Sequence, residues 1–228
     1  SDWRDGFEHA DAQAGWPAIY DRAYLQGNIA GGEGFDWFYA SAADRVAQVR
    51  TPISDGAAGK PWVFRYKDLR AWWSNAHYDR PGGVESGTLT AWAPESKPIW
   101  FTELGCPAID RGTNQPNVFF DPKSSESFTP HFSRGWRDDA IQRAYLEATY
   151  LWWGVPANNP VSSVYGGRMV HVPECAAWTW DARPYPFFPA LTDVWTDGAN
   201  WRLGHWLTGR LGAVSLAALV RHLCLRAG

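Results

Sequence analysis

The chain has 228 residues, with 24 acidic and 21 basic side chains and a formal net charge of −3. This length allows a large domain with a hydrophobic core, and the absence of a basic stripe argues against a nucleic-acid partner. No apolar run approaches the roughly 18 residues of a membrane-spanning helix, so no membrane span is expected.

Aromatic side chains are the unusual feature of the composition. The chain contains 16 Trp, 9 Tyr and 11 Phe residues. Most of them are expected to lie in the core. A minority at strand ends and in loops is expected to line a groove, because the apolar faces of sugar rings stack on flat aromatic side chains. The composition therefore favours either an aromatic core alone or a core with a carbohydrate-binding groove.

The first part of the chain is predicted to be rich in loops and then helical. Residues 1–33 alternate acids, glycines and aromatics without a sustained period. Residues 34–53 carry apolar side chains near helical spacing, which predicts a helix that Pro52 ends. A short strand at 60–66 is expected next, followed directly by a helix, and another strand is expected near 88–92.

The middle of the chain contains a predicted strand at 98–104, a long proline-containing loop to about residue 133, and the clearest helix at 134–154. Asp138 and Asp139 favour the first turn of this helix through the helix dipole. Gly154 and Pro156 are expected to end it. The apolar stripe of the helix is expected to consist of Ile141, Tyr145, Ala148 and Trp152. The side chains expected to pack between strand and helix are Trp100, Phe101, Tyr145 and Trp152.

The last part of the chain is predicted to contain a buried strand at 170–178 and a terminal helix at 213–226. Strands that alternate with helices indicate an α/β fold, and a helix between two strands indicates that the strands are parallel. Only three or four strands are apparent, whereas a complete barrel has eight strands in about 250 residues. Two architectures remain open: a small open α/β fold, or part of a barrel that lacks its earlier strands.

Glu103 is the first candidate for a site residue, because it ends the apolar run at 98–101. A lone carboxylate is costly to bury, and α/β barrels carry their chemistry at the carboxyl ends of their strands. The alternative is a structural Glu that caps a loop. Glycoside hydrolysis needs two carboxylates, about 5 Å apart for retention or roughly 6.5 to 9.5 Å apart for inversion. The candidates for the second carboxylate are Asp181, Asp36 and Glu174.

Other kinds of site find no support in the sequence. The six His residues show no HxH or HExxH spacing, so no metal site is expected. Cys106, Cys175 and Cys224 are odd in number and far apart, which fits buried thiols better than a disulfide framework. The sequence contains no P-loop, dinucleotide-binding or GxSxG motif, and no cofactor is expected.

Several long segments carry a resemblance to a known family. They are KPIWFTELGCPAIDRGTNQPNVFFDPKSSES, FSRGWRDDAIQRAYLEA, ECAAWTWDARPYPFFP and NWRLGHWLTGRLGA, with GGEGFDWFYASAADR and PWVFRYKDLRAWWSN. In these segments the chain resembles the TIM-barrel-like, glycoside-hydrolase-like domain of gene transfer agent and phage tail proteins of alphaproteobacteria. The likeness extends from residue 1 to about residue 215, and it includes long loops as well as short motifs.

The resemblance implies a fold. Residues 1–228 would form a single partial domain, the C-terminal part of a (β/α)8 barrel with long inserted loops, truncated on its N-terminal side. Residues 98–104 would be strand seven and residues 170–178 strand eight. Many retaining glycosidase barrels place their nucleophile at the end of strand seven, where Glu103 falls. They place the acid/base at the end of strand four, which this chain would lack.

The resemblance also implies a setting. The parent would be a large tail-tip or baseplate protein of a virion-like tail particle, made in the bacterial cytoplasm and related to host-specificity proteins. Its partners would be cell-surface carbohydrate and other tail or baseplate proteins. The expected substrate-binding residues are Trp178, Trp180, Trp73, Trp3 and Arg183.

Three functions therefore compete. The first is an enzyme that cuts cell-surface glycan with Glu103 as nucleophile, although the chain alone is expected to bind glycan weakly and to hydrolyse nothing. The second is a non-catalytic structural or receptor-binding tail module on a barrel scaffold. The third is an unrelated intracellular α/β protein. A second carboxylate at catalytic distance from Glu103 distinguishes the first function from the second.

Overall fold

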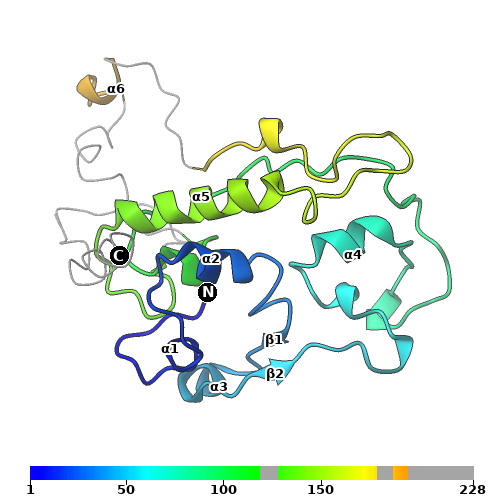
Figure 1. The fold of residues 1–228 in the computed structure, drawn as a ribbon, viewed down its shortest axis with the longest axis horizontal. Coiled ribbons are helices and arrows are strands. Elements are labelled where there is room, and N and C mark those ends of the chain that lie inside the picture. The colour runs from blue at the N-terminus through cyan, green and yellow to red at the C-terminus, as the bar shows by residue number, and fades with distance from the viewer. Residues whose placement is uncertain (119–127, 179–186, 195–228) are drawn as a thin grey trace. The chain divides into compact units, whose positions relative to one another are not determined.

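The computed structural model describes residues 1–118, 128–178 and 187–194 (Figure 1). The chain forms two compact units. Unit 1 comprises residues 1–25, 102–149 and the chain from 176 onward, and unit 2 comprises residues 26–101 and 150–175. Each unit is therefore assembled from segments that lie far apart in the sequence. None of the helices among the described residues is long and apolar enough to cross a membrane.

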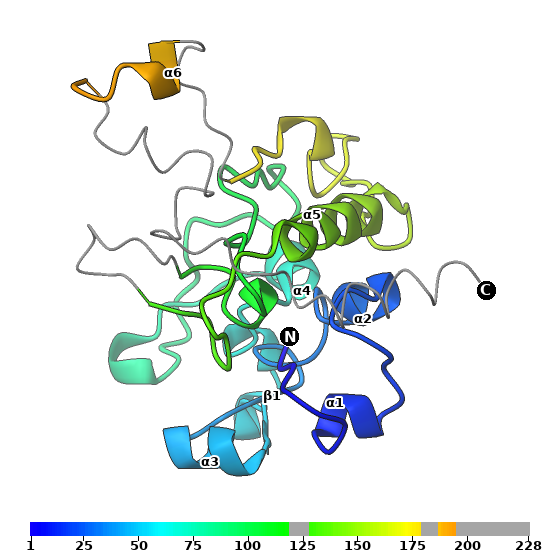
Figure 2. The ribbon, with the colours of Figure 1, turned by 90° about the vertical axis from the view of Figure 1, so that its left-hand side faces the viewer.

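Unit 1 contains the short helices α1 (Ala10–Gln13) and α6 (Phe187–Ala190), the beginning of α2 (Arg22–Gly27) and most of α5 (Asp139–Gly154). Helix α5 has 16 residues, and Figures 1 and 2 show it from the side and from one end. A 3-10 turn at Gly112–Asn114 lies in the long loop before α5. The predicted helix at 134–154 is thus confirmed, with a start at Asp139.

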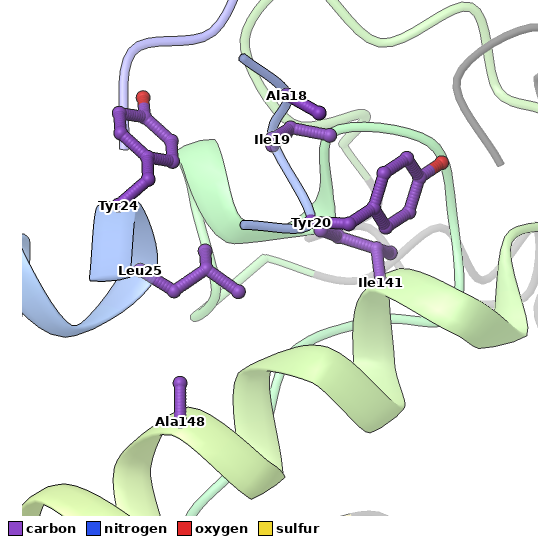
Figure 3. Close-up of a cluster of buried hydrophobic side chains, with 7 residues drawn as sticks. All are labelled: Ala18, Ile19, Tyr20, Tyr24, Leu25, Ile141 and Ala148. Atoms are coloured by element: carbon purple, nitrogen blue, oxygen red, sulfur yellow. The ribbon is translucent and has the colours of Figure 1, made fainter. Parts of the chain in front are cut away.

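The core of unit 1 forms where the N-terminal segment meets α5 (Figure 3). Ile141 and Ala148 point from α5 toward the segment that carries Tyr20 and toward Leu25 of α2. The cluster of buried side chains consists of Ala18, Ile19, Tyr20, Tyr24, Leu25, Ile141 and Ala148. Burial of apolar side chains contributes roughly 1.5 to 3 kcal/mol each, so these contacts hold the N-terminal segment against the helix.

Unit 2 contains the only sheet among the described residues. Strands β1 (Trp37–Phe38) and β2 (Thr51–Pro52) pair antiparallel, and α3 (Ala42–Ala47) connects them. The single long helix predicted at 34–53 is therefore wrong. Ser41 caps the shorter helix by accepting a hydrogen bond from the amide of Asp44, and Gln48 ends it in the left-handed region with φ of 57°.

The rest of unit 2 consists of helix α4 (Leu69–Ser74) and 3-10 turns at Gly56–Ala58, Pro61–Val63, Pro81–Gly83 and Val172–Glu174. The helix predicted directly after residue 66 is confirmed, and Asp68 caps it by accepting from the amide of Ala71. The strand predicted at 60–66 is wrong, because the segment forms the 3-10 turn at Pro61–Val63. The strand predicted near 88–92 is reduced to one antiparallel bridge between Tyr78 and Leu89.

The core of unit 2 is built around Trp73, Trp153, Met169 and Val170. Asn159 is also buried and connects two parts of this core through its side-chain amide. Its Nδ2 atom donates to the carbonyls of Trp153 and Val170, and its Oδ1 atom accepts from the amide of Val170. A buried amide is tolerated here because its polar atoms have partners.

The segments 98–104 and 170–178 pair in parallel, as predicted, but at two separate bridges. Within unit 2, Ile99 bridges Val170, and within unit 1, Leu104 bridges Ala177. Between the two bridges, the first segment advances five residues, from Ile99 to Leu104. The second segment advances seven residues, from Val170 to Ala177. The 3-10 turn at Val172–Glu174 takes up the difference, and its Pro173 has no amide to donate to a ladder. Continuous strands therefore do not form, although α5 does connect the two segments in the chain.

The predicted apolar stripe of α5 is confirmed at Ile141 and Ala148, and Tyr145 is partly buried, but the stripe ends at Trp153 instead of Trp152. Trp153, with 6% of its surface exposed, belongs to the core of unit 2, whereas Trp152 is only partly buried beside it. Trp100 is 55% exposed and stacks on His171, so its predicted place between strand and helix is wrong. Phe101 does pack against the core of unit 2.

Truncation of Trp153 tests this register. We expect Trp153→Ala to lower the free energy of unfolding by about 3 to 5 kcal/mol, because it leaves a large cavity in the core. Trp152→Ala, the matched control one position away, is expected to cost at least about 1 kcal/mol less. Urea denaturation followed by circular dichroism measures both variants. A larger loss of unfolding free energy in Trp152→Ala than in Trp153→Ala would show that the helix buries Trp152.

Candidate functional site

A pocket with a volume of about 220 Å³ opens in unit 1. Three segments form it: the N-terminal segment, the loop that follows the Leu104 bridge, and the residues that precede α5. Its lining combines aromatic rings with charged side chains. The lining residues are Trp3, Arg4, Asp5, Gly6, Phe7, Pro17, Ala18, Ile19, Tyr20, Asp110, Arg111, Arg134 and Trp136.

Asp110 fixes the geometry of the pocket. Its buried carboxylate accepts hydrogen bonds from Ser133 Oγ at 2.9 Å and from the amides of Arg134 and Trp136 at 3.0 and 2.9 Å. It also forms an ion pair with Arg111. A buried carboxylate needs several donors to offset its loss of hydration. Three of these donors belong to Arg111, Arg134 and Trp136, which line the pocket. Asp110 therefore positions these three residues.

Arg111 and Arg134 converge on one carboxylate at the edge of the pocket. Both guanidinium groups form ion pairs with Asp5, and Arg111 uses its other terminal nitrogen for Asp110. The backbone of Arg111 is left-handed, with φ of 58°, a conformation that is uncommon outside glycine. Burial, and then the nearby charge of Arg134, lower the pKa of Arg111 to about 10. The group therefore remains protonated at neutral pH.

Aromatic rings form the rest of the pocket wall. Trp3 and Trp136 are partly buried, whereas Phe7 is exposed. The Arg134 guanidinium lies 5.0 Å from the centre of the Trp136 ring, in a cation–π arrangement. The pocket thus places flat apolar surfaces beside forked, charged hydrogen-bonding groups.

A second buried carboxylate, Asp138, lies behind Tyr20. The Tyr20 hydroxyl donates to Asp138, which also accepts from the amide of Ile141 at 3.1 Å and so caps the start of α5. Burial raises the pKa of Asp138, and the nearby charge of Asp110 acts in the same direction, whereas the Tyr20 hydrogen bond lowers it. Burial and the adjacent Asp138 raise the pKa of Tyr20. Tyr20 lines the pocket, so its hydrogen bond to Asp138 holds that part of the pocket wall in place.

Metal chemistry has no obvious site in the part of the chain that the structure describes. No group of three or more His, Cys, Asp or Glu side chains there could hold a metal ion. The pocket is lined by three arginines and two carboxylates, and all of these except Arg4 form one ion-pair network. Such a network is suited to binding a polar ligand through charge-assisted hydrogen bonds.

A comparison with known protein families identifies the family of this chain. The family model of the GTA (gene transfer agent) TIM-barrel-like domain matches residues 1–189. The chain belongs to this family. The resemblance found in the sequence is thereby confirmed, and the match includes every segment that lines the pocket. No curated protein matches the chain.

Glu103 and Trp178 flank the parallel bridge between Leu104 and Ala177 in this GTA TIM-barrel-like domain, with Glu103 before it in one segment and Trp178 after it in the other. Glu103 is exposed in a bend and does not line the pocket. The amide of Trp178 donates to the carbonyl of Leu104, and a Cβ atom on Gly105 would lie 1.7 Å from the Trp178 carbonyl oxygen. The structure therefore brings the backbone segments of Glu103 and Trp178 together.

The remaining predicted site residues are dispersed. Trp3 lines the pocket of unit 1. Asp36 and Glu174 are exposed in unit 2, where Asp36 accepts from the amide of Gly32. Trp73 is 1% exposed, and its indole nitrogen donates to the carbonyl of Lys97, so it contributes to the core of unit 2. The predicted residues Trp180, Asp181 and Arg183 lie outside the described residues.

Sequence reasoning missed the charged residues of the pocket. Asp110 and Arg111 follow an apolar run in CPAIDRG, and Arg134 and Trp136 lie in FSRGW, two segments that carried the family resemblance. An acid and a base at the end of an apolar run were the available signal. No local pattern joins these segments to Asp5, which lies 106 residues from Arg111.

Asp110→Asn tests whether this carboxylate holds the pocket together. We expect a loss of about 3 to 5 kcal/mol in the free energy of unfolding, because the change breaks a buried ion pair and removes an acceptor oxygen. Asp5→Asn removes the exposed carboxylate that pairs with the same arginine. We expect it to cost less than about 1 kcal/mol. Equal losses in urea denaturation would contradict the central role of Asp110.

Proposed function

We propose that this GTA TIM-barrel-like domain binds cell-surface glycan in the pocket of unit 1 during host attachment, as part of a tail-tip or baseplate protein. Other tail or baseplate proteins are its partners in the particle. The observation that carries the proposal is the composition of the pocket, in which Trp3 and Trp136 stand beside Arg111, Arg134 and two carboxylates. Sugars present apolar ring faces and hydroxyl rims, and this lining offers a surface complementary to each.

The architecture that we propose is the C-terminal part of a (β/α)8 barrel, with residues 98–104 as strand seven and 170–178 as strand eight. The parallel bridges at Ile99–Val170 and Leu104–Ala177 support it, as does the position of α5 between the two segments in the chain. In barrels of this kind the loops at the carboxyl ends of the strands carry the binding residues. Asp110 and Arg111 lie on the loop that follows the proposed strand seven.

Binding is better supported than hydrolysis. A general acid must reach the leaving-group oxygen while protonated. The pKa of Asp138 is raised by burial, but this side chain is fully buried behind Tyr20 and does not line the pocket. Asp110 lines the pocket, but its oxygens are occupied by four donors. Glu103 remains the candidate nucleophile only together with residues outside those described.

Loss of an aromatic wall tests the binding function. We expect surface polysaccharide fragments from alphaproteobacterial cells to bind the chain with a dissociation constant on the order of millimolar, and Trp136→Ala to weaken binding about tenfold. Trp100→Ala, which removes an exposed Trp of unit 2, is the control and should leave binding unchanged. Titration followed by Trp fluorescence or NMR measures the affinities. Absence of binding by the unchanged chain would favour a purely structural tail module.

A glycan-cleavage assay separates binding from catalysis. We expect the 228-residue chain and its Glu103→Gln variant to release equal, background amounts of reducing ends from the same polysaccharide. The reason is that hydrolysis needs two carboxylates at a defined separation, and both carboxylates that line the pocket, Asp5 and Asp110, are held in ion pairs. Release by the unchanged chain that exceeds release by Glu103→Gln would contradict the binding-only proposal and would identify Glu103 as catalytic.

A further inference from the structure

The pocket already contains a bound carboxylate, which is that of the chain's own Asp5. The guanidinium groups of Arg111 and Arg134 both pair with it, although they come from loops that lie far from Asp5 in the sequence. Two planar guanidinium groups that meet at one carboxylate form a typical recognition geometry for a carboxylate or phosphate. The arrangement therefore shows what kind of group this corner of the pocket can hold.

Asp5 is held less firmly than the other carboxylate of the pocket. Its side chain is 54% exposed, whereas the side chain of Asp110 is 4% exposed and has partners on the backbone as well. Exposed ion pairs contribute little to stability. Asp5 can thus leave the two arginines and return to water at small cost, whereas Asp110 must stay.

One donor of Arg111 is still available. The Nε atom of this side chain is buried and has no hydrogen-bond partner among the residues that the structure describes. A buried donor without a partner is unfavourable. The donor inventory of Arg111 is therefore incomplete when only Asp5 and Asp110 are bound.

The charge balance of the corner fits a single negative charge. Arg4 pairs with Asp2 at 3.5 Å, and Arg111 pairs with Asp110. Once Asp5 has left, the charge of Arg134 remains uncompensated within the ion-pair network of the pocket. A monoanion restores neutrality, whereas a dianionic phosphate would add repulsion from the neighbouring Asp110.

We infer that Arg111 and Arg134 form a carboxylate-binding subsite, in which Asp5 stands in for the carboxylate of an acidic sugar of the uronic acid class. The inference rests on the proposed glycan-binding function and specifies its ligand. The sugar ring then lies against the aromatic wall that includes Trp136, and its carboxylate replaces that of Asp5 between the two guanidinium groups. Asp5 is a built-in competitor that lowers the apparent affinity.

Matched ligands test the subsite. The 228-residue chain is titrated with glucuronate and galacturonate and with their methyl esters, which keep the sugar but remove the charge. We expect the acids to bind at least about tenfold more tightly than the esters, because only the acids form charge-assisted bonds to both arginines. We also expect 0.5 M NaCl to weaken the binding of the acids but not that of the esters. Inorganic phosphate should compete for the subsite less well than uronate does.

Matched variants assign the effect to named residues. Asp5→Asn should bind the acids about fivefold more tightly, since it removes the internal competitor. Arg134→Gln should bind the acids about tenfold more weakly and weaken the binding of the esters much less, by about twofold or below. Glu8→Gln removes the same charge from an exposed neighbour that does not line the pocket, and it should change neither affinity. Circular dichroism checks that each variant is folded.

The outcomes separate this inference from the proposed function. Esters that bind as tightly as the acids, or an Asp5→Asn variant that binds the acids no better than Glu8→Gln does, would overturn the carboxylate subsite and leave glycan binding in place. Phosphate that outcompetes uronate would replace the sugar acid by a phosphate ligand and would also overturn the inference. If no saccharide binds any variant, including the surface polysaccharide fragments, the proposed function itself fails.

Discussion

The buried carboxylate of Asp110 is the interaction on which the pocket of unit 1 depends. Away from water, a carboxylate requires donors on most of its lone pairs. The chain supplies them from Ser133 and from the amides of Arg134 and Trp136, and Arg111 adds a charged donor. The same requirement that makes Asp110 tolerable therefore fixes a charged side chain and an aromatic ring at the mouth of the pocket.

The pairing around Asp110 continues into the start of α5. The amide of Asp110 donates to the carbonyl of Trp136, and the amide of Asp138 donates to the carbonyl of Ala108. Asp138 then caps the helix, whose Ile141 packs into the core beside Tyr20. Pocket, helix start and core are thus joined by a short antiparallel pairing, so damage at Asp110 should propagate into stability, whereas damage at Asp5 should not.

Features with local causes could be predicted from the sequence, and features set by distant contacts could not. Helix α5 could be predicted because acids favour its first turn through the helix dipole and a glycine ends it. Its buried residues Ile141 and Ala148 were predicted as well, but Trp153 is buried in place of Trp152, because the pattern alone does not say which of two adjacent aromatic residues a distant Met169 will meet. The candidate site shows the same division. Glu103 stands out locally, but the pairing of Asp5 with Arg134 spans 129 residues and leaves no local pattern.

Glu103 and the pocket belong to one stretch of chain, which bears on the proposed distinction between binding and hydrolysis. Leu104 forms the parallel bridge to Ala177, and six residues later Asp110 begins to organise the pocket. Hydrolysis demands two carboxylates at a defined separation, and the oxygens of Asp110 already accept from four donors. Binding demands only a shaped loop, and the donors of Asp110 hold that loop within unit 1. The proposed glycan binding therefore rests on the loop that carries Asp110 and Arg111, and it does not require a second carboxylate near Glu103.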